Sequence, residues 1–218
     1  MAAGDPVKPT ILSARLIPNV DRALAQRFGL REDQRSLGLV TCDIDDSLYV
    51  ALDEATKMAE VEVSYAHSFY AGADHASGPL SGEIIGVLAA PDPAEARAGL
   101  RACIDCAEQE AWFTWADDDE GIAFFAHTIS RTGRYLSGEA DVAEGTPLAY
   151  LIAPPIEATY ALDAALKAAE VELRVWFAPP SETNFSGGLL SGSQSACRAA
   201  AQAFGDAVMD VARDPRKW

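Results

Sequence analysis

The chain has 218 residues, of which 49% are hydrophobic and 23% charged, a composition typical of a globular protein. Its 33 acidic and 17 basic side chains give a formal net charge of −16, which disfavours nucleic acid and anionic membranes as partners because both are polyanions. The sequence contains no run of about 18 apolar residues, the length needed to cross a membrane. Its N-terminus lacks the basic start and apolar core of an export signal, so we expect a cytoplasmic protein.

The first predicted elements are a strand, a short helix and a second strand. Residues 9–18 alternate apolar and polar side chains, as a half-buried strand does, and a polar helix over Asp21–Phe28 can be closed by Gly29. The segment SLGLVTCD indicates a buried strand. Asp45 and Asp46 follow it where a helix N-cap is wanted, so they either cap the next helix or bind a ligand.

The next segment occurs twice, at an offset of 110 residues. ALDEATKMAEVEV at Ala51–Val63 and ALDAALKAAEVEL at Ala161–Leu173 are identical at nine of thirteen positions. In each copy, apolar residues at helical spacing are followed by apolar–polar alternation, which predicts a helix, a short turn and a half-buried strand. LSG at Leu80–Gly82 recurs at Leu190–Gly192 with the same offset. The sequence therefore predicts two similar tandem α/β domains, 1–112 and 113–218.

A long segment rich in small residues and proline follows the repeated strand in both copies. These segments are Ser68–Gly82 and Ala178–Gly192, and loops of this length in compact domains are usually functional or disordered. In the first copy a strand over Glu83–Ala90 and a proline-initiated helix are predicted next. In the second copy a helix over Ser193–Asp214 is predicted with no strand before it, so the copies are expected to differ there.

No dedicated catalytic, metal or redox motif is present. The pattern CxxC at Cys103 and Cys106 lies within a stretch of helical period, which favours ordinary buried or half-buried thiols over a redox site. The histidines show no metal-binding spacing, and GxSxG, Walker A and GxGxxG motifs are absent, so we predict no metal, no cofactor and no enzymatic activity. FTWADDDEG at Phe113–Gly121 favours a solvated charged turn.

The motifs, in their order along the chain, resemble those of the tandem-domain shell proteins of ethanolamine-utilization microcompartments. The resemblance covers about Pro9 to about Arg213 and is carried by RSLGLV, CDIDD, DEATKMAEVEV, SFYAGA, FTWADDDEG, RTGRYLSG, PLAYLIAPPIEATY and PPSETNFSGGLLSGSQSAC. It implies an α/β (α+β, ferredoxin-like) protein of two tandem, permuted bacterial microcompartment domains. It also implies that three chains form a pseudo-hexagonal tile that packs with other shell proteins, in a bacterial microcompartment within the cytoplasm.

The resemblance further implies a gated central pore, with the two long segments as its gate, and a small cavity for an amino alcohol such as ethanolamine. Two carboxylates and an aromatic ring suit a protonated amine, through charge-assisted hydrogen bonds and a cation–π contact. For Glu83 the alternative is a solvent-facing start of a strand. Residue-by-residue matching places the cavity at Asp45, Glu83, Phe113 and Thr183, with Asp46, Trp115 and Glu182 adjacent.

Two other classes of function stay open at this stage. One is a cytoplasmic allosteric sensor that binds a small amine through two ferredoxin-like domains and makes no shell. The other is an enzyme with a substrate-specific cleft. Sheet formation at high concentration distinguishes a shell protein from a sensor, and turnover of candidate amines tests for an enzyme.

Overall fold

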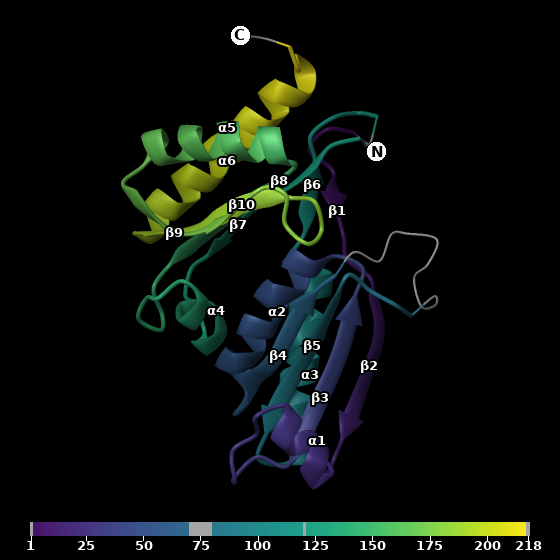
Figure 1. The fold of residues 1–218 in the computed structure, drawn as a ribbon. Helices are drawn as coiled ribbons and strands as arrows, with labels where there is room; N and C mark the ends of the chain where they lie inside the picture. Colours follow the sequence, from purple (N-terminus) through teal and green to yellow (C-terminus); the bar gives the residue numbers. More distant parts are fainter. Residues whose placement is uncertain (1, 70–79, 120, 217–218) are drawn as a thin grey trace. The chain divides into compact units, whose positions relative to one another are not determined.

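The chain folds into two units, each with helices packed on an antiparallel sheet (Figure 1). The computed structural model describes residues 2–69, 80–119 and 121–216. Unit 1 comprises Met1–Lys8, Trp112–Thr132 and Ser137–Trp218, and unit 2 comprises Pro9–Ala111 and Gly133–Leu136. Two short segments thus cross the predicted division between residues 112 and 113. In the described part of the chain no helix is both long enough and apolar enough to span a bilayer.

Unit 2 is built on a four-stranded sheet with strand order β2–β3–β5–β4 (Figure 1). The two central strands are mostly buried, whereas the edge strands are mostly half-buried. This pattern matches the predicted mixture of one apolar run and two alternating strands. The strands are β2 (Ile11–Ile17), β3 (Ser36–Cys42), β4 (Glu62–Ser68) and β5 (Ile84–Ala90).

Three helices complete the chain's first copy. The predicted first helix is confirmed as α1 (Arg22–Arg27). Asp21 caps its N-terminus by accepting from the N–H of Ala23, and Gly29, with a φ of 65°, follows its C-terminus. The repeated helix is α2 (Asp45–Met58), and it packs beside α3 (Pro93–Gln109). The predicted ordinary thiols are confirmed on α3: Cys103 and Cys106 are buried and free, and burial raises the pKa of Cys106 to about 12.

Unit 1 repeats this arrangement and extends it by two short strands. Its sheet has the order β1–β6–β7–β8–β10–β9, with α5 and α6 packed together on it (Figure 1). The strands are β1 (Pro6–Val7), β6 (Phe113–Trp115), β7 (Ala123–Ile129), β8 (Leu148–Ala153), β9 (Val171–Phe177) and β10 (Ser186–Gly192), and the helices are α5 (Pro155–Ala168) and α6 (Gln194–Arg213). The short helix α4 (Arg134–Glu139) begins in unit 2 and ends in unit 1. The order β7–β8–β10–β9 reproduces β2–β3–β5–β4, which confirms the predicted duplication.

The predicted difference between the copies before the last helix is wrong. β10 occupies Ser186–Gly192, within the segment Ala178–Gly192 that was predicted to be a loop, and it pairs with β8 and β9. Glycine and serine are rare in strands, so the pattern suggested a loop. The structure requires small residues there: a Cβ at Gly188 would lie 2.5 Å from the carbonyl oxygen of Val175.

The two copies of LSG do not occupy equivalent positions in the two units. Leu190–Gly192 ends β10, whereas Leu80–Gly82 precedes β5, so the two copies of LSG occupy different places in their sheets. Of the other predicted loop, Ser68–Gly82, residues 70–79 lie outside the described residues. The loop of the second copy is short, since only residues 178–185 separate β9 from β10.

A buried carboxylate on α2 holds the segment Gly133–Leu136 in unit 2. Asp53 is 1% exposed, and its Oδ2 and Oδ1 accept from the backbone N–H groups of Gly133 at 2.7 Å and Leu136 at 2.9 Å. Burial raises the pKa of Asp53, while these two hydrogen bonds act in the opposite direction. We call this contact the Asp53 clasp, comprising Asp53, Thr56 and the segment Gly133–Leu136.

The rest of the clasp explains why glycine starts this segment. A Cβ at Gly133 would overlap the Thr56 side chain, whose hydroxyl accepts from the N–H of Arg134 at 3.0 Å. The Arg134 guanidinium then donates to the carbonyl oxygen of Val61 at 2.8 Å, beyond the end of α2. Main chain and side chains together therefore fix the segment on one face of α2.

Replacing Asp53 by Ala should lower the free energy of unfolding by about 2–4 kcal/mol, because two buried N–H groups lose their acceptor. Denaturant unfolding measures the change. Asp105→Ala, at an exposed position of α3, is the matched control and should change the stability by less than about 0.5 kcal/mol. Equal stability of the two variants would show that the clasp contributes nothing.

Candidate functional site

Two of the predicted ligand carboxylates lie close together in unit 2, at the end of β3 where α2 and β5 begin. The pairing of Cys42 with Ile84 brings these ends together, and the N–H of Glu83 donates to the carbonyl oxygen of Cys42 at 2.8 Å. Gly82 allows this approach, because a Cβ there would overlap the backbone of Cys42. Asp45 opens α2 directly after this point.

We call Asp45, Asp46 and Glu83 the acidic group of unit 2, and the charges of Asp45 and Glu83 interact. Burial and the negative charges of Asp45 and Asp43 raise the pKa of Glu83 to about 7. Asp45 is only 7% exposed, and its Oδ1 accepts from the N–H of Asp46 at 2.9 Å. At neutral pH Glu83 is therefore divided between its neutral and charged forms. A cation beside it would favour the charged form and release a proton.

The prediction that Asp45 or Asp46 caps α2 is wrong. Ile44 is the N-cap residue and makes no side-chain cap hydrogen bond, while Asp45 and Asp46 occupy the first turn itself. Both carboxylates still interact favourably with the positive end of the helix dipole. The other reading of these two residues, ligand binding, stays a prediction.

Asp43 and Tyr49 are neighbours of this acidic group that the sequence did not single out. Asp43 accepts from the N–H of Thr10 at 2.6 Å. The Tyr49 hydroxyl lies 2.6 Å from Ser68 Oγ, and burial raises the pKa of Tyr49 to about 12, with the charges of Asp45 and Asp46 adding to the effect. The string CDIDD contained the signal for Asp43, but Tyr49 looked like an ordinary helix residue.

The four other predicted ligand residues belong to unit 1. Phe113 and Trp115 lie on β6, and Glu182 and Thr183 lie between β9 and β10. Phe113 is a core residue, 5% exposed, with one ring face stacked on Phe125 at a centroid distance of 5.0 Å. This contact leaves at most one face for a cation.

The remaining three residues differ in exposure. The Trp115 indole nitrogen is buried and has no hydrogen-bond partner among the described residues. Thr183 is 7% exposed, and its hydroxyl lies 3.5 Å from that of Ser181. Glu182 is exposed and lines a pocket of about 530 Å³ beside Trp176. An aromatic ring and a carboxylate at one pocket are groups that suit an organic cation.

No group of three or more potential metal ligands occurs in the described ranges. The acidic group of unit 2 is the one place in the described residues where predicted site residues come together within a unit, because Glu182 is the only one of them that lines the pocket beside Trp176.

Comparison with known proteins gives concordant results. A family model described as the BMC domain matches residues 36–113. The chain is 55% identical to the bacterial microcompartment shell protein EutL of Clostridium perfringens, over 97% of each chain. It is 52% identical to the protein of the same name from Salmonella typhimurium, over 99% of this chain and 98% of that one.

Solved structures agree with these relatives. The ethanolamine utilization protein EutL from Leptotrichia buccalis matches with a TM-score of 0.97 and 57% identity, covering 99% of this chain and 100% of that one. A structure described as a trimeric bacterial microcompartment shell protein, PduB, has a TM-score of 0.76 and covers 94% of this chain and 89% of its own. At 20% identity, the second match shows a shared fold alone.

Glu83→Gln should make stability less dependent on pH. The pKa of Glu83 is about 7 in the folded chain against an ordinary 4.5, so the folded state binds the extra proton and loses stability as pH rises from about 4.5 to 7. Glutamine avoids that loss. At pH 8 the variant should be more stable than wild type by about 1–2 kcal/mol, a value reduced because the carboxyl group is only half-buried.

Denaturant unfolding at pH 4 and pH 8 provides the measurement, and the two proteins should be equally stable at pH 4. Glu108→Gln, at an exposed position of α3, is the control for loss of a surface charge. If wild type and Glu83→Gln keep the same difference at both pH values, Glu83 is fully solvated and the electrostatic description is wrong.

Proposed function

The chain belongs to the EutL family of bacterial microcompartment shell proteins, and we propose that three copies form a pseudo-hexagonal tile of the shell. As a shell protein it is a structural component of the microcompartment and not an enzyme. The observation that supports the trimer is the duplication: both units of a chain contain the same order of four strands, so three chains present six similar units. Closed cyclic symmetry is the usual arrangement of such homo-oligomers.

The trimer is tested by its mass in solution. Three chains of 23.1 kDa give a particle of about 69 kDa, which light scattering coupled to size exclusion measures directly. Concentrated protein should then form sheets of tiles. A monomer over a wide concentration range would contradict the tile and favour the amine sensor.

A second part of the proposal is that the acidic group of unit 2 binds a small protonated amino alcohol such as ethanolamine. The support is the closeness of Asp45 and Glu83, together with the burial and the electrostatic repulsion that raise the pKa of Glu83. A bound ammonium group would relieve this repulsion and donate charge-assisted hydrogen bonds to both carboxylates. The name of the Leptotrichia buccalis relative, an ethanolamine utilization protein, suggests the ligand.

The role of the four unit 1 residues in amine binding stays a prediction. Phe113 can offer at most one ring face, Thr183 a hydroxyl and Glu182 a carboxylate, with Trp115 on the same strand β6 as Phe113. Substituting each of them separately and measuring amine affinity distinguishes contributors from bystanders.

Amine binding should weaken by about 1–3 kcal/mol in Asp45→Asn and in Glu83→Gln, because each substitution removes a charged partner. Titration calorimetry with ethanolamine gives the affinities. Wild-type affinity should rise from pH 6 to pH 8 as Glu83, with a pKa of about 7, becomes ionised, and Glu83→Gln should lose this rise. Unchanged affinity and pH dependence in both variants would exclude the acidic group as the amine site.

The third part of the proposal is a central pore gated by the loops that follow β4 and β9. Residues 70–79 of the first loop lie outside the described residues, so support comes from the second. That loop contains a tight turn, in which Asn184 donates its N–H to the carbonyl oxygen of Ser181 at 3.0 Å and has a φ of 66°. Only a ligand that distinguishes two loop states can shift their populations.

We expect bound amine to favour the closed state of this gate. Flux of a bulky solute through assembled shells should therefore fall when ethanolamine is added, and shells of the Glu83→Gln variant should not respond. Equal flux under all four conditions would show that these loops are ordinary surface connections.

A further inference from the structure

Unit 1 has an exposed apolar face on α5. Ile156, Tyr160 and Leu166 are 75%, 54% and 37% exposed and recur at helical spacing along one side of the helix. Apolar residues of this size scattered singly on a surface need no explanation, but three on one helix face form a patch. We call these three residues, together with Asp163 between them, the α5 face.

The corresponding face of α2 is buried. The repeat places α2 and α5 at an offset of 110 residues, so each residue of the α5 face has a defined counterpart on α2. The counterparts are Asp46, Val50, Asp53 and Thr56, which are 6%, 5%, 1% and 2% exposed. The same side of the same repeated helix is therefore covered in unit 2 and uncovered in unit 1.

The clearest contrast is between the two aspartates of the repeat. Asp53 binds the backbone N–H groups of Gly133 and Leu136 in the Asp53 clasp. The Asp163 side chain is 61% exposed and pairs only with its own helix, through Lys167 at 2.6 Å, as far as the described contacts go. The α5 face thus has the aspartate of a clasp without the segment that the clasp holds.

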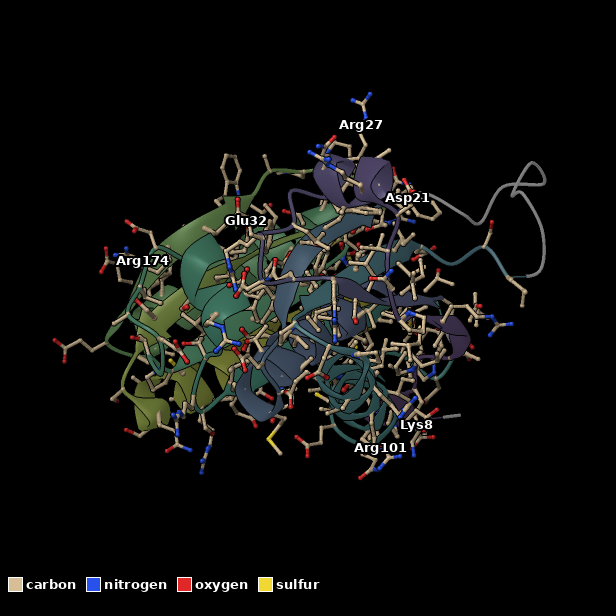
Figure 2. All side chains as sticks on the ribbon, turned by 90° about the horizontal axis from the view of Figure 1, so that it is seen from below. Lys8, Asp21, Arg27, Glu32, Arg101 and Arg174 are labelled. Atoms are coloured by element: carbon tan, nitrogen blue, oxygen red, sulfur yellow. The ribbon has the colours of Figure 1, made fainter. Side chains whose placement is uncertain are left out.

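The counterpart of that segment is found at the start of α1. Each copy has a short helix between the first two strands of the shared four-strand order. Gly133–Leu136 forms the start of this helix, α4, in the second copy, and Asp21–Leu24 forms the start of its counterpart, α1, in the first copy. Leu136 is 2% exposed, whereas Leu24 is 40% exposed. Figure 2 shows the side chains of Asp21 and Arg27 standing at the surface of α1. We call Asp21–Leu24 the α1 segment.

Each chain therefore carries two halves of a contact that it does not complete. Among the residues that the structure describes, the α5 face has no covering segment and the α1 segment covers no helix. We propose that the α5 face of one copy binds the α1 segment of a second copy, repeating the Asp53 clasp between chains. This inference rests on the proposed tile and identifies the surfaces that would join its subunits.

The residue types suit a contact between separate chains. In the clasp the positions beside Asp53 are held by Asp46 and Thr56, whereas the α5 face has Ile156 and Leu166 there. When two separate molecules associate they lose translational and rotational entropy, a cost that a contact within one chain does not have. Burial of apolar area supplies the free energy that offsets this cost. Leu24 adds a matching apolar side chain on the partner surface.

Charge also matches at the end of the helix. Arg134 in the clasp donates to the carbonyl oxygen of Val61, beyond the C-terminus of α2. Its counterpart in the α1 segment is Arg22, an exposed arginine, and the counterpart of Val61 is Val171, beyond the C-terminus of α5. A guanidinium group is favourable at the negative end of a helix dipole. Arg22 can therefore take the place of Arg134.

The contact joins two different surfaces, so it is head-to-tail. A two-fold dimer joins identical surfaces and would leave the α5 face of each chain uncovered or facing its own copy. A head-to-tail contact is completed for every chain only in a closed ring. This geometry agrees with a three-membered tile and disfavours a symmetric dimer.

Disulfide cross-linking between copies tests the inference on the full-length chain. The double variant L24C/D163C places thiols at the counterparts of Leu136 and Asp53, whose backbone nitrogen and Oδ1 are 2.9 Å apart. Both positions are exposed, so the fold should tolerate them, and the four native cysteines are buried. Mild oxidation should convert most of the double variant into covalent dimers and trimers on denaturing gels.

Three controls make the result specific. The single variants L24C and D163C should give no covalent trimer, and L24C/D206C, with its second thiol at an exposed position of α6, should give no ladder. If light scattering shows a trimer but L24C/D163C does not cross-link beyond L24C/D206C, the α5 face is not the subunit contact and the inference is wrong while the tile stands. A wild-type monomer overturns both.

Discussion

A buried carboxylate needs hydrogen bonds, and this requirement at Asp53 determines how unit 2 is completed. Asp53 lies on α2, where its two oxygens accept from Gly133 and Leu136, so a segment from the second half of the sequence becomes part of the first sheet-and-helix unit. Without that segment, the Asp53 carboxylate would keep its ion pair with Lys57 at 3.8 Å but lose both backbone hydrogen bonds. The same requirement, transferred to Asp163, leads to the proposed contact between chains.

Duplication was predictable from the sequence because repeated helices keep the same residues on their buried face. The pairs Leu52 and Leu162, and Ala55 and Ala165, are identical and buried in both units. By contrast, Asp53 and Asp163 are also identical, yet one is buried and the other exposed. The identity of a residue in a repeat does not determine which segment packs on it, so the Asp53 clasp could not be predicted from the pattern.

The errors of the sequence prediction have physical causes. β10 was missed because Ser186, Gly187 and Gly188 lack side chains typical of strands, although close strand packing is the reason for glycine there. The capping role of Asp45 was wrong by one position, since α2 begins at the aspartate itself. The assignment of Asp45 and Glu83 to an amine site stays a prediction, and the raised pKa of Glu83 depends on burial and on the charges of Asp45 and Asp43, which only three-dimensional structure shows.

The acidic group lies at the starts of α2 and β5, whereas the proposed subunit contact joins α5 to the α1 segment, so the two can be tested separately. The subunit contact depends on the tile. A structure of the assembled protein by electron cryomicroscopy is the most direct measurement. The result predicted is three copies around a three-fold axis, with Leu24 of each copy buried against Tyr160 and Asp163 of the next. A two-fold dimer, or a ring in which the α5 face remains in solvent, would contradict the central claim that the chain forms its tile by repeating the Asp53 clasp.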